Sequence, residues 1–113
     1  MNLQLVRTGG TLFLLVAILF LSSAPLLAQG DAASVFKTKC AICHGPDGSG
    51  NTTMGKQMKI PDLRSADVQK QTDAQLIEAT TNGKGKMTAY KGKLTEDQIK
   101  QLVAFVRELA KKK

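Results

Sequence analysis

Apolar residues recur at helical spacing along the last stretch of the chain. Between residues 96 and 110 they fall mostly three or four residues apart, at Ile99, Leu102, Val103, Phe105, Val106 and Leu109. This spacing gives an α-helix one apolar face. Thr95 and Gln98 stand three residues apart just before the run, which is the arrangement of a capping box at a helix start. We therefore predict a helix from Glu96 to about Ala110.

A second capping box, Thr72 with Gln75, precedes a shorter apolar pattern. It predicts a helix over residues 73–81 that stops at Gly83. One side of this helix carries Leu76, Ile77 and Thr80. The residues between the two helices, 83–93, include three glycines and are predicted to form a loop.

The first half of the chain is less regular. Asp31 can cap a short helix that runs into Cys40, with Val35 and Phe36 on its apolar face. Residues 45–51 consist of Gly, Pro, Asp, Ser and Asn, which predicts turns rather than a regular element. The expected fold class is all-α.

The N-terminal residues have the pattern of an export signal. Arg7 is the only charged residue before an apolar run over residues 12–21, and a break with small residues follows up to Ala28. This predicts a secretory signal peptide over residues 1–28, cleaved after Ala28. An uncleaved anchor is the alternative, although the run is far shorter than the roughly 20 residues that span a bilayer. We expect residues 29–113 to form one exported, periplasmic domain without a membrane span.

This domain is small and has little material for a core. Its aromatic residues are Phe36, Tyr90 and Phe105, and it has no tryptophan. A large apolar cofactor at the centre would compensate for this shortage. Fifteen basic and nine acidic residues give the domain a net charge of +6, which favours an acidic partner. Export argues against nucleic acid as that partner.

The residues Cys40-Ala41-Ile42-Cys43-His44 carry the candidate chemistry. At this spacing two thiols bond the vinyl groups of haem c, and the adjacent imidazole becomes the proximal ligand of the iron. A zinc site would need a carboxylate as fourth ligand, because the chain has no other Cys or His. A thioredoxin-like dithiol would need a βαβ setting, and a disulfide would close too small a loop to stabilise the fold much. The motif favours haem.

An iron that only passes electrons needs a second protein ligand opposite His44. Met87 follows His44 by 43 residues, which is far enough for the chain to reach the opposite face of a haem. Met54 and Met58 follow it much more closely, so we favour Met87, then Met58, then Met54. Near Pro61, a backbone carbonyl could accept a hydrogen bond from the other nitrogen of His44 and so fix the ring.

These motifs resemble those of class I c-type cytochromes, of the small bacterial monohaem type related to cytochromes c6 and c5. The resemblance spans residues 31–110 and rests on the haem motif with Gly45, on Asp47 to Gly50, Pro61-Asp62-Leu63, Gly85-Lys86-Met87, Ala89-Tyr90, Leu102 and Phe105. It implies three to five short helices wrapped around one covalently bound haem c, with the first and last helices crossing at Phe36 and Phe105.

The resemblance also assigns residues to the haem site. It implies covalent bonds from Cys40 and Cys43, iron ligation by His44 and Met87, and further contacts from Pro61 and Tyr90. The carbonyl of Pro61 would accept the hydrogen bond from His44. The chain departs from the family pattern at Thr88, where a proline usually follows the methionine, at Ile60, where glycine often precedes the proline, and at Ala32, where glycine is common.

The implied function is that of a soluble, exported single-electron carrier rather than an enzyme. Its partners would be redox proteins that dock near the haem edge, where Lys84, Lys86, Lys91 and Lys93 cluster close to Met87. Two alternatives remain. In the first, the chain is a haem subunit of a dehydrogenase or oxidase complex. In the second, it is a haem protein with an open sixth position, such as a peroxidase or gas sensor.

Overall fold

The computed structural model describes residues 27–112, with side chains from Asp31 onward, so the predicted signal peptide lies outside the described residues except for positions 27 and 28. Its elements are α1 Leu27–Val35, the π-helical turn η1 Phe36–Cys40, α2 Ala41–His44, α3 Thr53–Met58, α4 Ala66–Gln69, α5 Asp73–Asn82 and α6 Glu96–Lys111. Over the described range the only strand-like pairing is an isolated bridge between Lys91 and Leu94. The predicted all-α class is confirmed.

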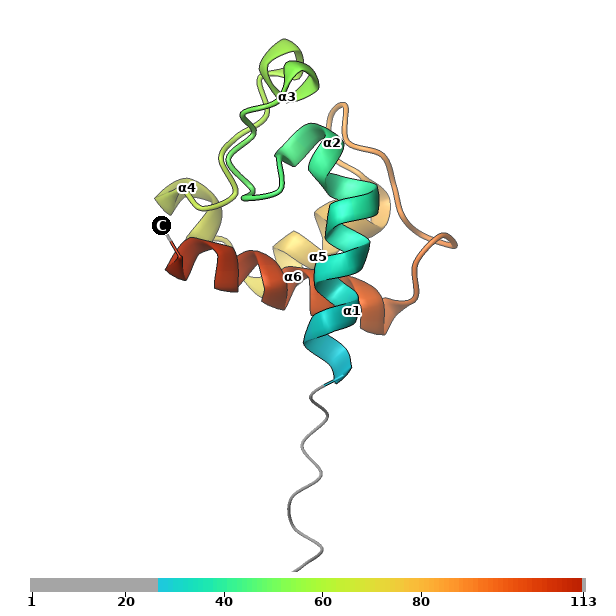
Figure 1. The fold of residues 1–113 in the computed structure, drawn as a ribbon. Helices are drawn as coiled ribbons and strands as arrows, with labels where there is room; N and C mark the ends of the chain where they lie inside the picture. The colour runs from blue at the N-terminus through green and yellow to red at the C-terminus, as the bar shows by residue number, and fades with distance from the viewer. Residues whose placement is uncertain (1–26, 113) are drawn as a thin grey trace, which may run out of the picture.

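The N-terminal helical segment runs through α1, η1 and α2 without a break and passes across α6 (Figure 1). At the crossing the rings of Phe36 and Phe105 pack with centroids 5.2 Å apart and planes tilted by 52°. Ala32 is also buried. The predicted aromatic pair at the crossing is confirmed, and it fixes the helix that leads into the haem motif.

The predicted cap at Asp31 is wrong. Asp31 lies inside α1, which begins at Leu27. The residues before it include Leu27, Ala28 and Gln29, all of which favour helix and extend it upstream of the expected start.

Both capping boxes are confirmed at the starts of α5 and α6. Thr72 accepts from the backbone N–H of Gln75 at 3.2 Å, and Gln75 Oε1 accepts from the backbone N–H of Thr72 at 2.9 Å. Thr95 and Gln98 form the same pair of bonds at 3.1 and 2.9 Å. Each box satisfies amides that a helix start otherwise leaves without partners.

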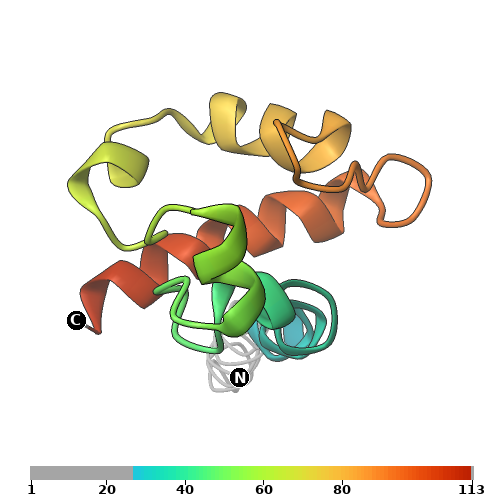
Figure 2. The ribbon, with the colours of Figure 1, turned by 90° about the horizontal axis from the view of Figure 1, so that it is seen from above.

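The core is built on the apolar face of α6. Its buried residues in the described part of the chain include Phe36, Leu94, Ile99, Leu102 and Leu109. Helix α5 packs along α6 and α3 packs against α2, while α4 lies near the C-terminal end of α6 (Figure 2). In the range that the structure covers, no helix is both long and apolar enough to cross a bilayer.

Candidate functional site

The haem motif lies where the chain passes from a π-helical turn to an α-helical turn. Cys40 is the last residue of the π-helical turn η1, and Cys43 and His44 end the short helix α2. Such π-turns occur often at functional sites. The two thiols are free rather than joined by a disulfide, and both are partly buried. Cys40 and Cys43 lie on one helical turn, and the imidazole of His44 directly follows them.

The residues that follow the motif, 45–55, hold this turn in place. Gly45 ends α2 with φ of +79°, and the backbone N–H of Gly50 then donates to His44 O at 2.7 Å. The hydroxyl of Thr52 donates to Cys43 O at 2.8 Å and accepts from Gly55 N at 2.9 Å. A side chain at Gly55 would lie 2.6 Å from Cys43 O and even closer to Gly50 O. Glycine is thus required for this close approach of α3 to the motif.

A cavity of about 660 Å³ opens beside the motif. This volume lies in the range of about 300–1,000 Å³ typical of sites for small molecules and cofactors. Its lining comes from η1, α2, α3, the segment 59–63, α4, α5 and the loop 83–93. It includes Cys40, Cys43, His44, Met54, Met58, Ile60, Pro61, Leu63, Val68, Leu76, Ala79, Met87 and Tyr90. Every residue that the sequence assigns to the haem site therefore meets this cavity.

His44 has the environment of a ligand rather than of a surface residue. Burial lowers the pKa of its imidazole below the usual 6.5, so the ring is neutral at neutral pH. Its Nδ1 atom is buried and makes no hydrogen bond with any part of the described chain. The predicted bond to the carbonyl of Pro61 is not formed here, although Pro61 lines the same cavity. A buried nitrogen without a partner is costly, so His44 Nδ1 is expected to gain an acceptor when the site is complete.

Cys40 is also kept uncharged by its surroundings. Burial raises the pKa of its thiol to about 11, and the nearby positive charge of Lys39 only partly offsets this effect. Metal binding by Cys requires the thiolate. Over the described range no group of three or more His, Cys, Asp or Glu side chains could hold a metal ion, so the zinc alternative lacks its further ligands.

Met87 lies in the loop between α5 and α6, half-buried at the cavity wall. The chain turns sharply at Gly83, directly after α5, where φ is +78°. A side chain at this position would lie 2.6 Å from Met87 O, so the close approach of the two residues requires glycine. Met54 and Met58 of α3 line the same cavity. The cavity thus brings three thioethers together, and its shape alone does not choose among them.

Tyr90 closes one edge of the cavity. Its hydroxyl donates to Lys39 O at 3.0 Å, which joins the Met87 loop to the residue before Cys40. Burial raises the pKa of this phenol. The hydroxyl therefore keeps its proton and stays a donor at neutral pH.

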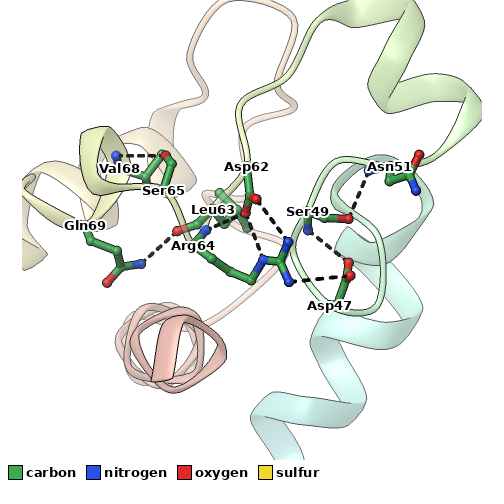
Figure 3. A network of polar contacts seen from close by, with 9 residues as sticks. All are labelled: Asp47, Ser49, Asn51, Asp62, Leu63, Arg64, Ser65, Val68 and Gln69. Atoms are coloured by element: carbon green, nitrogen blue, oxygen red, sulfur yellow. Dashed lines mark hydrogen bonds and ion pairs between the residues drawn. The ribbon is translucent and has the colours of Figure 1, made fainter. Parts of the chain in front are cut away.

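Arg64 connects the two segments that flank His44, and sequence reasoning missed it. Its guanidinium bonds both carboxylate oxygens of Asp62 at 3.0 Å and lies 3.7 Å from Asp47 Oδ2 (Figure 3). Asp47 also accepts from the backbone N–H of Ser49 at 3.0 Å. Hydrogen bonding to the side chain and then to the backbone of Ser49 lowers the pKa of the Asp47 carboxyl, and Arg64 adds a smaller effect. The Asp-Gly-Ser turn was visible in the sequence, but no local pattern indicated which cation would reach it.

Lysines surround the mouth of the cavity. Lys39, Lys59, Lys84 and Lys86 belong to its lining and are exposed. Two of them, Lys84 and Lys86, belong to the predicted docking cluster. Lys91 and Lys93 are exposed as well but do not belong to the lining.

Known proteins are similar to this chain in sequence. Residues 28–106 match the family model described as cytochrome c oxidase, cbb3-type, subunit III. Cytochrome c6 of Leptolyngbya boryana is 38% identical over 85 residues, covering 73% of this chain and 96% of that protein. The cbb3-type cytochrome c oxidase subunit FixP of Rhizobium meliloti is 37% identical over 89 residues, covering 77% of this chain and 29% of that protein.

A solved structure has the same fold. The KustC0563 c-type cytochrome superposes with a TM-score of 0.64 and 31% sequence identity, over 69% of this chain and 95% of that one.

Proposed function

The chain belongs to the c-type cytochrome family, as a small monohaem member, and from this we propose that it is an exported carrier of single electrons. Haem c, when bound, supplies the one-electron chemistry of its iron. Cys40 and Cys43 would hold it by thioether bonds, and His44 and Met87 would ligate the iron. The single observation that carries this proposal is the meeting of both thiols, the imidazole and the thioether at one largely apolar cavity.

The residues suit these tasks chemically. His44 offers a neutral nitrogen because burial keeps its pKa low. We expect Pro61 O to become the acceptor for His44 Nδ1–H once the ring is oriented by ligation, since second-shell acceptors of this kind fix ligating imidazoles. Met87 offers a soft sulfur, which raises the reduction potential. With both axial positions filled by protein, no substrate needs to reach the iron.

Carbon monoxide tests this function directly. Reduced wild-type protein should not bind carbon monoxide, whereas Met87→Ala should bind it and lose the sulfur-to-iron(III) charge-transfer band with the helical fold kept. Met58→Ala is the matched control, because Met58 lines the same cavity. If Met58→Ala opened the iron and Met87→Ala did not, the ligand assignment would be wrong; carbon monoxide binding by the wild type would favour a sensor or peroxidase instead.

We also propose that an acidic redox partner docks on the lysine rim, defined as Lys39, Lys59, Lys84 and Lys86. All four are exposed at the mouth of the cavity, where a partner can come nearest to the haem edge. Small, charge-steered interfaces suit brief contacts between redox proteins. The net positive charge of the domain would assist the approach over longer distances.

The rim is tested with charge reversal at two sites. Lys84→Glu with Lys86→Glu should slow the second-order reaction with an acidic redox protein, most strongly at low salt, because 0.1 M salt screens charges beyond about 10 Å. Lys100→Glu with Lys112→Glu is the control, since it changes the net charge equally on α6 and at its C-cap, at residues outside the lining. Equal slowing by both pairs would point to net charge alone and contradict docking at the rim.

Export rests on the N-terminal pattern of residues 1–28. The signal peptide and its cleavage after Ala28 stay predictions, which the mass of the protein recovered from the periplasm would check. A chain that retains residues 1–28 in the membrane fraction would favour the anchored alternative.

A further inference from the structure

Tyr90 makes a hydrogen bond that joins two segments of the cavity lining that lie far apart in the sequence. Its hydroxyl donates to Lys39 O at 3.0 Å across 51 positions of sequence. Lys39 directly precedes Cys40, and Tyr90 lies three residues beyond Met87. In the described chain this is the hydrogen bond that joins the loop 83–93 to the N-terminal helical segment. The ring of Tyr90 packs at the edge of the core and also lines the cavity.

The other anchors of the loop are backbone hydrogen bonds to α5, and Tyr90 itself makes one of them. The backbone N–H groups of Tyr90 and Lys91 donate to Thr80 O and Thr81 O of α5, at 3.0 and 2.9 Å. These two bonds pin the base of the loop to α5. Met87 lies in the part of the loop between Gly83 and Tyr90. Its backbone N–H donates within the loop, to Lys84 O at 3.0 Å. The methionine is thus carried by residues 83–89, a segment whose two ends are both attached to α5.

The segment has little stiffness of its own. Gly83, Gly85 and Gly92 all adopt positive φ, at 78°, 58° and 77°, and the loop contains no proline. Glycines widen the range of accessible backbone conformations, whereas proline would restrict it. A side chain at Gly85 or Gly92 would touch nothing within 4 Å, so packing does not hold these positions either. A contact that bridges to the N-terminal helical segment therefore has a large influence on where Met87 lies.

We propose that Tyr90 is a positioning residue that holds the Met87 loop closed over the sixth coordination position by its bond to Lys39 O. This inference rests on the proposed function, because it assumes that Met87 is the distal ligand. The hydroxyl acts as a latch between the attachment turn and the distal loop, and it keeps the thioether from leaving the iron. Without the latch, the loop opens more often about its anchors on α5, and the sixth position becomes accessible to small ligands.

The test compares haem-loaded wild type with haem-loaded Tyr90→Phe. This change removes the hydroxyl but keeps the ring and its packing. Binding of cyanide to the ferric protein requires departure of the methionine sulfur, so its rate should rise about two- to tenfold, the factor that corresponds to the net value of one hydrogen bond. Amide hydrogen exchange should accelerate by a similar factor within residues 84–89, but not at the anchoring amides of Tyr90 and Lys91 or in α6.

Thr38→Val is the matched control. The hydroxyl of Thr38 lies in the same helical segment as Lys39 but donates locally, to Ser34 O at 3.0 Å. Its loss should leave the cyanide rate and the loop exchange at wild-type values. An unchanged cyanide rate in Tyr90→Phe overturns the proposal, whether or not the loop amides exchange faster, because the latch would then not govern the ligand.

Met87→Ala separates the two hypotheses. If it removes the sulfur-to-iron(III) charge-transfer band while Tyr90→Phe behaves as wild type, the ligand assignment stands and the latch alone is refuted. If the band survives in Met87→Ala, the ligand assignment itself is wrong, and the proposed role of Tyr90 falls with it.

Discussion

At the scale of single residues, the absence of a side chain at Gly55 is as informative as the chemistry of the haem motif. Gly55 lies where α3 meets the carbonyls of Cys43 and Gly50, and it is buried. No sequence pattern marked it, because its role depends on a contact between segments that only the folded chain brings together. By contrast, Cys40, Cys43 and His44 were recognisable at once, since their chemistry depends on local spacing alone.

We predict that Gly55→Ala destabilises the protein by about 1–3 kcal/mol, because the added methyl group must push α3 away from the haem motif. Urea unfolding of the haem-loaded protein measures the change. Gln57→Ala is the control, because Gln57 is exposed in the same helix. Equal stability of the Gly55→Ala variant and the wild type would show that α3 can shift without cost.

We also predict that acid weakens the fold through His44. Burial places the pKa of folded His44 below 6.5, whereas the unfolded chain takes up a proton near 6.5. Below that pH the unfolded state binds more protons, so the free energy of unfolding must fall as the pH falls. Ligation of iron acts in the same direction, because a coordinated nitrogen cannot take the proton.

The expected slope reaches at most about 1.4 kcal/mol per pH unit for this one group. His44 is the only histidine in the chain, so no other side chain ordinarily titrates in this range. Urea unfolding at pH 7.5, 6.5 and 5.5 checks the slope. A free energy of unfolding that stays constant or rises over this range would contradict the assignment.

At the scale of elements, Arg107 fastens the linker between α4 and α5 to α6. Its guanidinium donates to Gln69 O at 3.0 Å, to Gln71 O at 2.6 Å and to Asp73 Oδ1 at 2.8 Å. Gln71 lines the cavity, so this clamp also fixes part of the cavity wall. The sequence identified α6 and its apolar face but not the polar contacts on its other side.

We expect Arg107→Met to lower the free energy of unfolding by about 1–3 kcal/mol, because two backbone carbonyls lose charged donors. The ion pair with Asp73 contributes little of this, since Asp73 is exposed. Thermal unfolding monitored by circular dichroism measures the loss. Lys100→Met on the same helix is the control, and a loss of equal size there would assign the effect to surface charge instead of to the clamp.

The elements differ in how well the sequence predicted them. Helices α5 and α6 begin where expected and end within one residue of the expected position, because capping boxes and apolar spacing act locally. Helices α3 and α4 were not predicted. They contain six and four residues, too few for a periodic pattern, and their stability depends on tertiary contacts such as that at Gly55. The start of α1 was misplaced because Asp31 can serve as a cap or as an ordinary helical residue.

At the scale of the whole molecule, the protein is a small helical shell around a cavity. The buried side chains in the described part of the chain come largely from α6 and from Phe36, and Cys40 and Ala41 pack against them. The cavity of about 660 Å³ has Cys40, Cys43 and His44 in its lining. A domain of this size has little apolar surface to bury by itself. The covalent group is therefore expected to be part of the core, and its loss should cost the fold as well as the function.

Peptide mass analysis of the exported protein tests the central claim most directly. The peptide that contains Cys40-Ala41-Ile42-Cys43-His44 should carry the mass of one haem after acid acetone treatment, which removes haem that is not covalently bound. The double variant Cys40→Ala with Cys43→Ala should carry none and should lack a stable fold. An unmodified wild-type peptide, or a folded double variant that keeps covalent haem, would contradict the account.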